Sequence, residues 1–227
     1  MRVSSQPSPL VPIRLEVQPG VWLDSRLALW LPQVRVLAVA DLHWGYAASH
    51  RARGNLLPWW GDDEIEQRLR ALLSDYQPAE MIWLGDCVHA AEGGARAEAF
   101  LRTSPVPILP LAGNHDRRWR AAGAAAAVRG NYFFHHGDAA PAVPAHAIEV
   151  VGHHHPAVSW GDRAGSRFKL PALVVSAHRL VLPAFSPWAA GTPWTGEAGV
   201  EETLWVIAPT RIFALPRNPT LALAEPA

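Results

Sequence analysis

The stretch VLAVADLHWG, residues 36–45, places an aspartate and a histidine directly after a run of small and branched apolar residues. Such a run is typical of a buried β-strand, so Asp41 and His43 stand at the C-terminal end of a predicted strand. In open α/β sheets, ligands bind at that edge. Asp41 and His43 are therefore the first candidate site residues.

The same arrangement, an apolar strand followed by polar side chains, recurs four times further along the chain. Five strand ends of this kind can converge on one place at the edge of a sheet. The later candidates are Asp86 after MIWLG, Asn114 and His115 after ILPLAG, His136 after YFFH, and His153 and His155 after IEVVG.

These side chains are carboxylates, imidazoles and an amide, and they are too many for a single four-coordinate ion. The pattern therefore predicts two divalent metals. Asp86 follows Gly85, where the backbone can turn sharply, and we expect this aspartate to bridge the two ions. In an extended backbone, residues two apart share a face, so Asp41 should pair with His43. By the same rule His153 and His155 should face the same side, and His154 should point away.

The predicted elements alternate between strand and helix in the first half and become β-rich in the second. This order favours one α/β domain over residues 1–227, built from two mixed β-sheets packed face to face and flanked by helices. Residues 216–227 are rich in Pro and Ala and are expected to form a loose tail. The predicted helices are 62–76, 92–104 and 115–130, and the predicted strands lie in 20–30, 34–41, 79–86, 106–114, 132–138, 147–155, 167–185 and 202–215.

The composition limits the possible partners. Lys and Arg together number 20 and balance 20 Asp and Glu, so no overall basic field attracts nucleic acid or membranes. The single cysteine, Cys87, excludes an internal disulfide and a thiolate zinc site, and it favours a small buried hydrophobe. The sequence shows no signal peptide and no apolar run long enough to span a bilayer, which predicts a cytoplasmic protein without a membrane partner.

Eleven tryptophans are unusual for this length. Several lie among turn residues, in LPWWGDD (57–63), VSWGD (158–162) and SPWAAGTPW (186–194). Exposed tryptophans of this kind can stack on nucleic-acid bases, whereas most tryptophans fill core and loop packing. Both interpretations remain open from the sequence.

The blocks DLH, GD, GNHD, HG and GHHH, in this order, resemble the calcineurin-like metallophosphoesterases, whose pattern is D-x-H, G-D, G-N-H-D/E, H and G-H-x-H. The intervening segments DLHWGYAASHRARGNLLP, GDCVH, HHGDAAP and LVLPAFSPWAAG are similar to one bacterial branch, the ligase-associated DNA damage response endonucleases. The resemblance implies a four-layer α/β metallophosphatase sandwich.

The resemblance also implies a role for each candidate. His115 stands beside the scissile phosphate and protonates or stabilises the leaving oxygen, oriented by Asp116. The implied cofactors are two divalent transition metals, with Mn²⁺ favoured and Fe or Zn as alternatives. The implied metal ligands are Asp41, His43 and His155 for the first metal, Asn114, His136 and His153 for the second, and Asp86 as the bridge.

The expected function is phosphodiester hydrolysis, with DNA as the substrate of an endonuclease that acts on single-stranded or flexible DNA in repair. A functional association with DNA ligase and helicase follows from the same resemblance. The first alternative is a small-molecule phosphodiesterase or phosphomonoesterase with the same two metals. The second is a metal-binding scaffold without catalysis.

Several other polar residues lie near the metal blocks. His135 competes with His136 for the fourth block, and the glycine after His136 favours the latter. His89 either contacts substrate or hydrogen-bonds a loop, while His50, His146 and His178 are expected to be structural. The candidate phosphate contacts, each of which is otherwise a solvated surface arginine, are Arg51, Arg53, Arg117, Arg118, Arg163 and Arg167.

Overall fold

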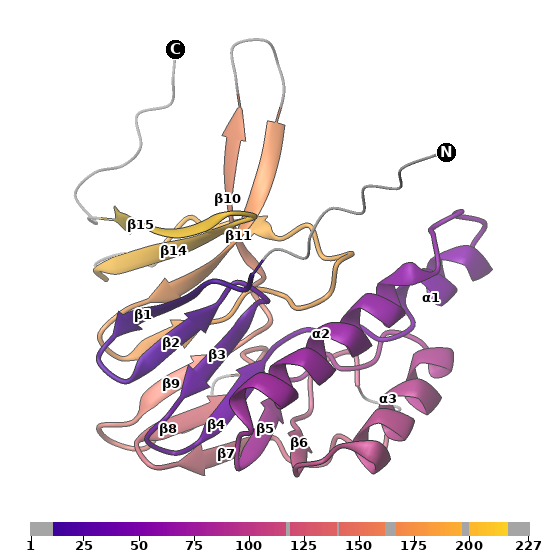
Figure 1. Cartoon of the computed structure of the whole chain (residues 1–227), viewed down its shortest axis with the longest axis horizontal. Coiled ribbons are helices and arrows are strands. Elements are labelled where there is room, and N and C mark those ends of the chain that lie inside the picture. Colours follow the sequence, from indigo (N-terminus) through magenta and orange to yellow (C-terminus); the bar gives the residue numbers. More distant parts are fainter. Residues whose placement is uncertain (1–10, 117–118, 140, 162–166, 197–199, 218–227) are drawn as a thin grey trace, which may run out of the picture.

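The computed structural model describes residues 11–116, 119–139, 141–161, 167–196 and 200–217. Their strands form a six-stranded and a nine-stranded sheet, which lie against each other in Figure 1. Each sheet contains parallel and antiparallel pairs. The prediction of an α/β sandwich with two mixed sheets is therefore confirmed.

The first sheet brings the first three ligand blocks to one edge. Its strands are antiparallel from β1 to β4 and parallel from β4 to β6. Because parallel strands end on the same side, the loops after β4, β5 and β6 meet. In sheet order the strands are β1 (Arg14–Gln18), β2 (Val21–Asp24), β3 (Ala28–Leu31), β4 (Val36–Val39), β5 (Glu80–Trp83) and β6 (Ile108–Pro110).

The second sheet delivers the last two blocks in the same way, because β8, β9 and β12 run parallel. A β10–β11 hairpin extends from the body of the molecule, as Figure 1 shows. The strands are β7 (Ala126–Arg129), β8 (Tyr132–His135), β9 (Ile148–Val151), β10 (Pro156–Gly161), β11 (Arg167–Val175), β12 (Arg179–Val181), β13 (Thr192–Pro193), β14 (Glu202–Ala208) and β15 (Arg211–Arg217).

Two long helices cover the outer face of the first sheet. α2 (Trp60–Tyr76) and α3 (Ala91–Thr103) confirm the helices predicted at 62–76 and 92–104. Both helices join Leu37 and Trp83 of the sheet in one apolar cluster. A short helix, α1 (Tyr46–Ala52), was not predicted. Among the described residues, no helix has the length and apolar character that a bilayer crossing needs.

The main core lies between the two sheets. Ala38 and Ile82 from the first sheet pack with Phe134, Val150 and Leu173 from the second, and all five are fully buried. Burial of such side chains stabilises by roughly 1.5–3 kcal/mol for each large residue. This packing fixes the two ligand-bearing edges relative to each other.

The helix predicted at 115–130 is wrong. In its described part the chain makes turns and then forms β7, which pairs antiparallel with β8. Gly130, with a φ of 58°, provides the turn between them. The alanines favour a helix locally, but hydrogen bonding to the sheet edge outweighs that weak propensity.

Two further predictions need correction. Residues 20–30 form two strands rather than one, because the Asp24 side chain accepts a hydrogen bond from the Arg26 backbone N–H and turns the chain. The expected tail at 216–227 begins too early, since β15 continues to Arg217 in register with β14. Residues 218–227 lie outside the described residues.

Candidate metal centre

Six of the seven predicted metal ligands gather in two groups of three. Within each group, one candidate ligand atom from every residue lies within 4.8 Å of the others. The seventh, Asn114, has its Oδ1 3.1 Å from Nε2 of His136. The first triad is Asp41, His43 and His155, and the second triad is Asp86, His136 and His153.

The backbone reaches these positions in a way that the sequence analysis did not foresee. Both Asp41 and His43 have positive φ angles, 55° and 51°, so the extended geometry expected for DLH is wrong although the two side chains do share a site. Asp86, His153 and His155 also have positive φ, at 46°, 65° and 46°. Such angles cost of order 1–3 kcal/mol each and cluster at functional sites.

Hydrogen bonds between the loops hold this strained backbone. The N–H of His43 donates to the carbonyl of Asp86 at 2.9 Å, which ties the loop after β4 to the loop after β5. The N–H of His153 donates to Oδ2 of Asp41 at 2.9 Å and connects the two sheets. The loops that carry both triads therefore brace one another.

Two glycines make the close approach possible. Gly85 has a φ of +77°, and a Cβ there would lie 2.6 Å from the ring of His136. A Cβ on Gly113 would collide with the backbone N of Asp86. Side chains are excluded at both positions, and at Gly85 this agrees with the sharp turn that the sequence predicted.

His136 is oriented as a metal ligand requires. Its Nδ1 lies 2.7 Å from the carbonyl of Leu84, so Nδ1 carries the proton and the Nε2 lone pair faces the site. That lone pair meets oxygens of Asn114 and Asp86, at 3.1 and 3.4 Å. A cation among these atoms satisfies all three acceptors.

The charge balance also fits a cation. Burial opposes a charge on His136, but the hydrogen bond to Asp86 and the charges of Asp86 and Asp41 raise the pKa of His136 to about 9. The surroundings of His136 therefore favour a positive charge at this place. Burial opposes ionisation of Asp86 as well, but His136 and the backbone N–H of His115 lower the pKa of Asp86 to about 2.

His43 is held in the neutral form that ligates metals. Burial lowers the pKa of His43 to about 4, against the opposing charges of Asp41 and Asp86. Its buried Nδ1 has no protein hydrogen-bond partner. Because carboxylate, neutral imidazole and amide suit divalent transition metals, the residues of both triads fit two such ions.

His115 and Asp116 differ in what they contact. The His115 side chain is 46% exposed, and its Nε2 lies 3.9 Å from Oδ2 of Asp86. Asp116 is buried, and its carboxylate accepts backbone N–H bonds from Cys87, Val88 and Gly113 at 2.9–3.1 Å. The expectation that Asp116 orients the His115 ring is corrected: the carboxylate that faces the ring belongs to Asp86, and Asp116 positions the loops.

A row of rings extends from His115 along the site. His115 stacks on His89 at 5.3 Å between ring centroids, His89 packs against Tyr46 at 4.7 Å, and Tyr46 stacks on His50 at 4.4 Å. His50 was expected from the sequence to be structural, and Tyr46 had no predicted role. Their spacing of four residues on one face of α1 was the available signal.

A family model for calcineurin-like phosphoesterases matches residues 34–182, a range that contains both triads and Asn114. The chain belongs to the calcineurin-like phosphoesterase family. It is therefore a metal-dependent phosphoesterase of a family that uses a binuclear divalent metal site, and the two triads are the candidate residues for that site.

One solved structure with a similar fold is the nuclease MPE of Pseudomonas putida. It shares 25% sequence identity with this phosphoesterase, with a TM-score of 0.66, and the alignment covers 90% of this chain and 100% of the nuclease. Comparison with curated proteins gives no match.

The predicted phosphate contacts of the phosphoesterase have different surroundings. The Nη1 of Arg51 donates to the Leu57 carbonyl at 2.9 Å, and its guanidinium lies over the Trp59 ring. Arg53 is exposed, and its charge contributes to the lowered pKa of His89, after burial and the charges of His115 and His50. Arg117, Arg118 and Arg163 lie outside the described residues, as does the side chain of Arg167.

The remaining histidines face other partners. His135 Nε2 lies 2.7 Å from Oε1 of Glu149, so His136 rather than His135 enters the second triad. His154 contacts Arg179 and belongs to neither triad. His178 is exposed in the turn between β11 and β12.

Proposed function

We propose that this phosphoesterase is a single-domain, two-metal DNA endonuclease that cuts single-stranded or flexible DNA. The observation that carries the proposal is the half-exposed His115 ring beside the second triad. An exposed ring at this position can be reached by a long, flexible substrate. The nuclease activity in the name of the Pseudomonas putida neighbour supports the same assignment.

The two triads would hold the metals. We assign Asp41, His43 and His155 to the first ion, Asn114, His136 and His153 to the second, and Asp86 to the position between them. The charge of Asp86 acts on His43 of the first triad and on His136 of its own. Bound divalent ions neutralise the phosphate charge and activate a water molecule as nucleophile.

The chain's own residues perform the remaining steps. His115 donates a proton to the oxygen of the leaving group, and its ring is steadied by His89 on one side and His43 on another. We assign Arg53, Arg51 and His89 to contacts with the DNA backbone beside the scissile phosphate, with His89 stacked on His115. We assign Mn²⁺ as the working metal and a cytoplasmic repair role beside DNA ligase and helicase.

The test compares circular single-stranded DNA with bis-p-nitrophenyl phosphate, both with added Mn²⁺. We expect the wild type to linearise the circle, which has no ends. Asp86→Ala should abolish both activities, and His115→Ala should lower DNA cleavage by roughly 10²–10⁴-fold, as expected for loss of a general acid. His178→Ala, which removes an exposed histidine outside both triads, is the matched control.

Two results contradict the proposal. Hydrolysis of the small ester without cleavage of any DNA would assign a small-molecule phosphodiesterase instead. If His115→Ala and His178→Ala reduced DNA cleavage equally, His115 would have no catalytic role.

A further inference from the structure

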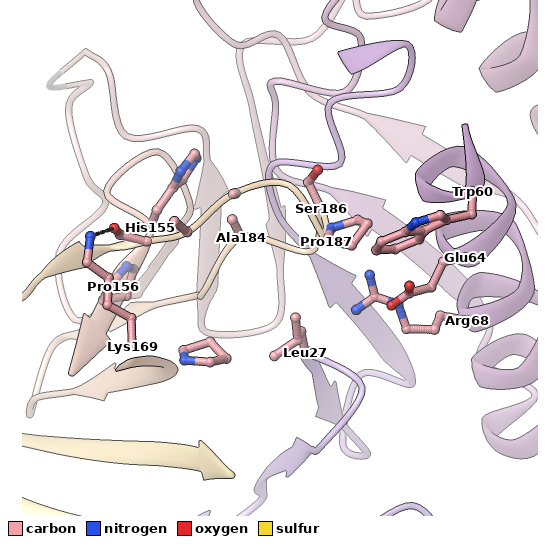
Figure 2. Close-up of a pocket in the computed structure, with 14 residues that line it drawn as sticks. Leu27, Trp60, Glu64, Arg68, His155, Pro156, Lys169, Ala184, Ser186 and Pro187 are labelled. Atoms are coloured by element: carbon pink, nitrogen blue, oxygen red, sulfur yellow. Dashed lines mark hydrogen bonds and ion pairs between the residues drawn. The ribbon is translucent and has the colours of Figure 1, made fainter. Parts of the chain in front are cut away.

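A cleft of about 450 Å³ lies beside the metal centre and shares His155 with the first triad (Figure 2). Trp60, Glu64 and Arg68 of α2 line one end, and Pro156 and Lys169 of the second sheet line the other. The chain from Ala184 to Gly191 runs between these ends. The volume falls in the range of about 300–1,000 Å³ that is typical of small-ligand sites.

Trp60 offers a rigid aromatic face in this cleft. It is 47% exposed, although a tryptophan of this size is usually covered. Its ring packs against Trp188 with centroids 4.8 Å apart and planes at 34°. Trp188 reaches this position because the neighbouring Gly61 has no side chain, and a Cβ there would overlap the indole nitrogen of Trp188.

The cleft also carries an excess of positive charge. Arg68 lies over the Phe185 ring at 4.4 Å, and burial lowers the pKa of Arg68 only to about 10, so it stays protonated at neutral pH. Glu64 offsets one charge, with Oε1 3.6 Å from Nε of Arg68. Lys169 is exposed at the other end and donates to the carbonyl of Gly191 at 3.1 Å.

We propose that this cleft is a subsite for the nucleotide next to the scissile phosphate. The base of that nucleotide stacks on Trp60 at the end of the cleft where Arg68 adds positive charge, and its phosphate is held by Lys169 at the other end. An exposed indole face next to a net positive charge recognises a ring joined to an anion, which is the chemistry of a nucleotide. The inference rests on the proposed DNA substrate and adds the residues that position it.

Side chains of β11 point alternately to its two faces, and this provides a matched control. Lys169 and Pro171 face the cleft, whereas Phe168 and Leu170 face a separate hollow on the opposite side of the strand. Phe168 is 56% exposed and stacks on Trp160. Phe168→Ala therefore removes an exposed aromatic ring of β11 without touching the cleft.

The first experiment measures kcat/KM on circular single-stranded DNA and on bis-p-nitrophenyl phosphate for wild type, Trp60→Ala, Trp60→Phe and Phe168→Ala. We expect Trp60→Ala to lower kcat/KM on DNA roughly ten-fold, mainly through KM, and to lower it much less on the small ester, because the loss is that of one stacked base. Trp60→Phe should retain most of the DNA activity, and Phe168→Ala all of it.

The second experiment uses the fact that Lys169 is the only lysine of the chain. A lysine-acylating reagent is applied to Mn²⁺-loaded His115→Ala protein, which keeps every proposed metal ligand, with and without a single-stranded oligonucleotide. We expect bound DNA to slow acylation of Lys169 several-fold, as measured by mass spectrometry, with added N-acetyl-lysine as the reference for reagent activity.

The outcomes distinguish failure of the proposed subsite from failure of the proposed endonuclease function. Equal DNA cleavage by wild type and Trp60→Ala, a matching loss on both substrates, or acylation of Lys169 that DNA does not slow would overturn the subsite while the endonuclease assignment stands. A wild type that hydrolyses the small ester but no DNA would overturn the endonuclease assignment, and the subsite with it.

Discussion

The carboxylate of Asp116 ties together the two loops that end β5 and β6. It is 3% exposed and accepts three backbone N–H groups, from Cys87, Val88 and Gly113. Each buried donor that loses its partner costs about 1–3 kcal/mol. The contacts of Asp116 therefore hold the two loops in position, and none of them is with the His115 ring.

Asp116→Ala should destabilise the protein by about 3 kcal/mol or more, because it leaves three buried donors unpaired. DNA and bis-p-nitrophenyl phosphate hydrolysis should fall together, since the whole loop moves. Urea unfolding and the two assays measure this. Loss of activity with unchanged stability would instead indicate a direct catalytic role.

The Glu149 carboxylate contacts two side chains of the second sheet, those of His135 and Arg179. The hydrogen bond from His135 lowers the pKa of Glu149 below its ordinary value of 4.5, burial opposes this shift, and the charge of Arg179 reinforces it. A carboxyl group whose pKa is lower in the folded than in the unfolded protein stabilises the fold at pH values above its pKa in the unfolded state. That stabilisation is lost as the pH falls through the lower pKa that Glu149 has in the folded protein.

Glu149→Gln should therefore reduce the free energy of unfolding by about 1 kcal/mol at pH 7, with a smaller difference at each step below pH 4.5. Urea titrations of both proteins from pH 7 to pH 4 measure the difference. If the stability difference between wild type and Glu149→Gln grew as the pH fell, the pKa of Glu149 would be raised in the folded protein rather than lowered.

At the scale of elements, the ends of the strands decide the geometry of the site. β4 and β5 deliver Asp41, His43 and Asp86 through backbone turns of positive φ, braced by bonds from one loop to the next. Gly85 lies in the narrowest of these turns, against the ring of His136. Rigid strand ends hold ligands more accurately than free loops do.

Gly85→Ala should abolish hydrolysis of both substrates, because the new Cβ displaces His136 from the second triad. Gly20→Ala is the matched control, since Gly20 has the same φ of +77° but meets only the flexible Gln33 side chain. Both variants carry a similar backbone cost, of about 1–2 kcal/mol, for an L-residue in the left-handed region. Equal activity in the two variants would mean that strain, and not displacement of His136, determines the effect.

At the scale of the whole molecule, the metal centre connects the two sheets. Each triad combines residues that follow strands of the first sheet with residues that follow strands of the second. The inter-sheet core already aligns these edges. Metals bound at both triads therefore stabilise the packing of one sheet on the other.

Removal of the metals should lower the melting temperature. At a free Mn²⁺ concentration of 100 times Kd, one site contributes about 2.7 kcal/mol, which corresponds to roughly 5–10 °C for a chain of this length. Differential scanning calorimetry with Mn²⁺ and with a chelator measures the shift. Asp86→Ala should lose it, whereas Asp63→Ala, at an exposed position on α2, should keep it. A shift of equal size in both variants would place the stabilising metal elsewhere.

The sequence by itself determined the two sheets, the two long helices and the set of polar residues at the strand ends. These features follow from local patterns: apolar runs mark strands, amphipathic periodicity marks α2 and α3, and parallel strands present their C-terminal ends together. The pairing of Asp41 with His43 was also predicted, although the extended geometry given as its reason was wrong.

Only the tertiary structure decided the arrangement of those residues. This arrangement depends on partners far apart in the chain. Cys87 and Val88 donate to Asp116 from the preceding strand end, Trp60 packs on Trp188, and Asp41 and the His153 N–H are separated by 112 residues. Strand β7 formed in a segment with helical propensity for the same reason. Local sequence sets weak preferences for secondary structure. Packing and hydrogen bonds between segments distant in the sequence outweigh these preferences where the segments come into contact.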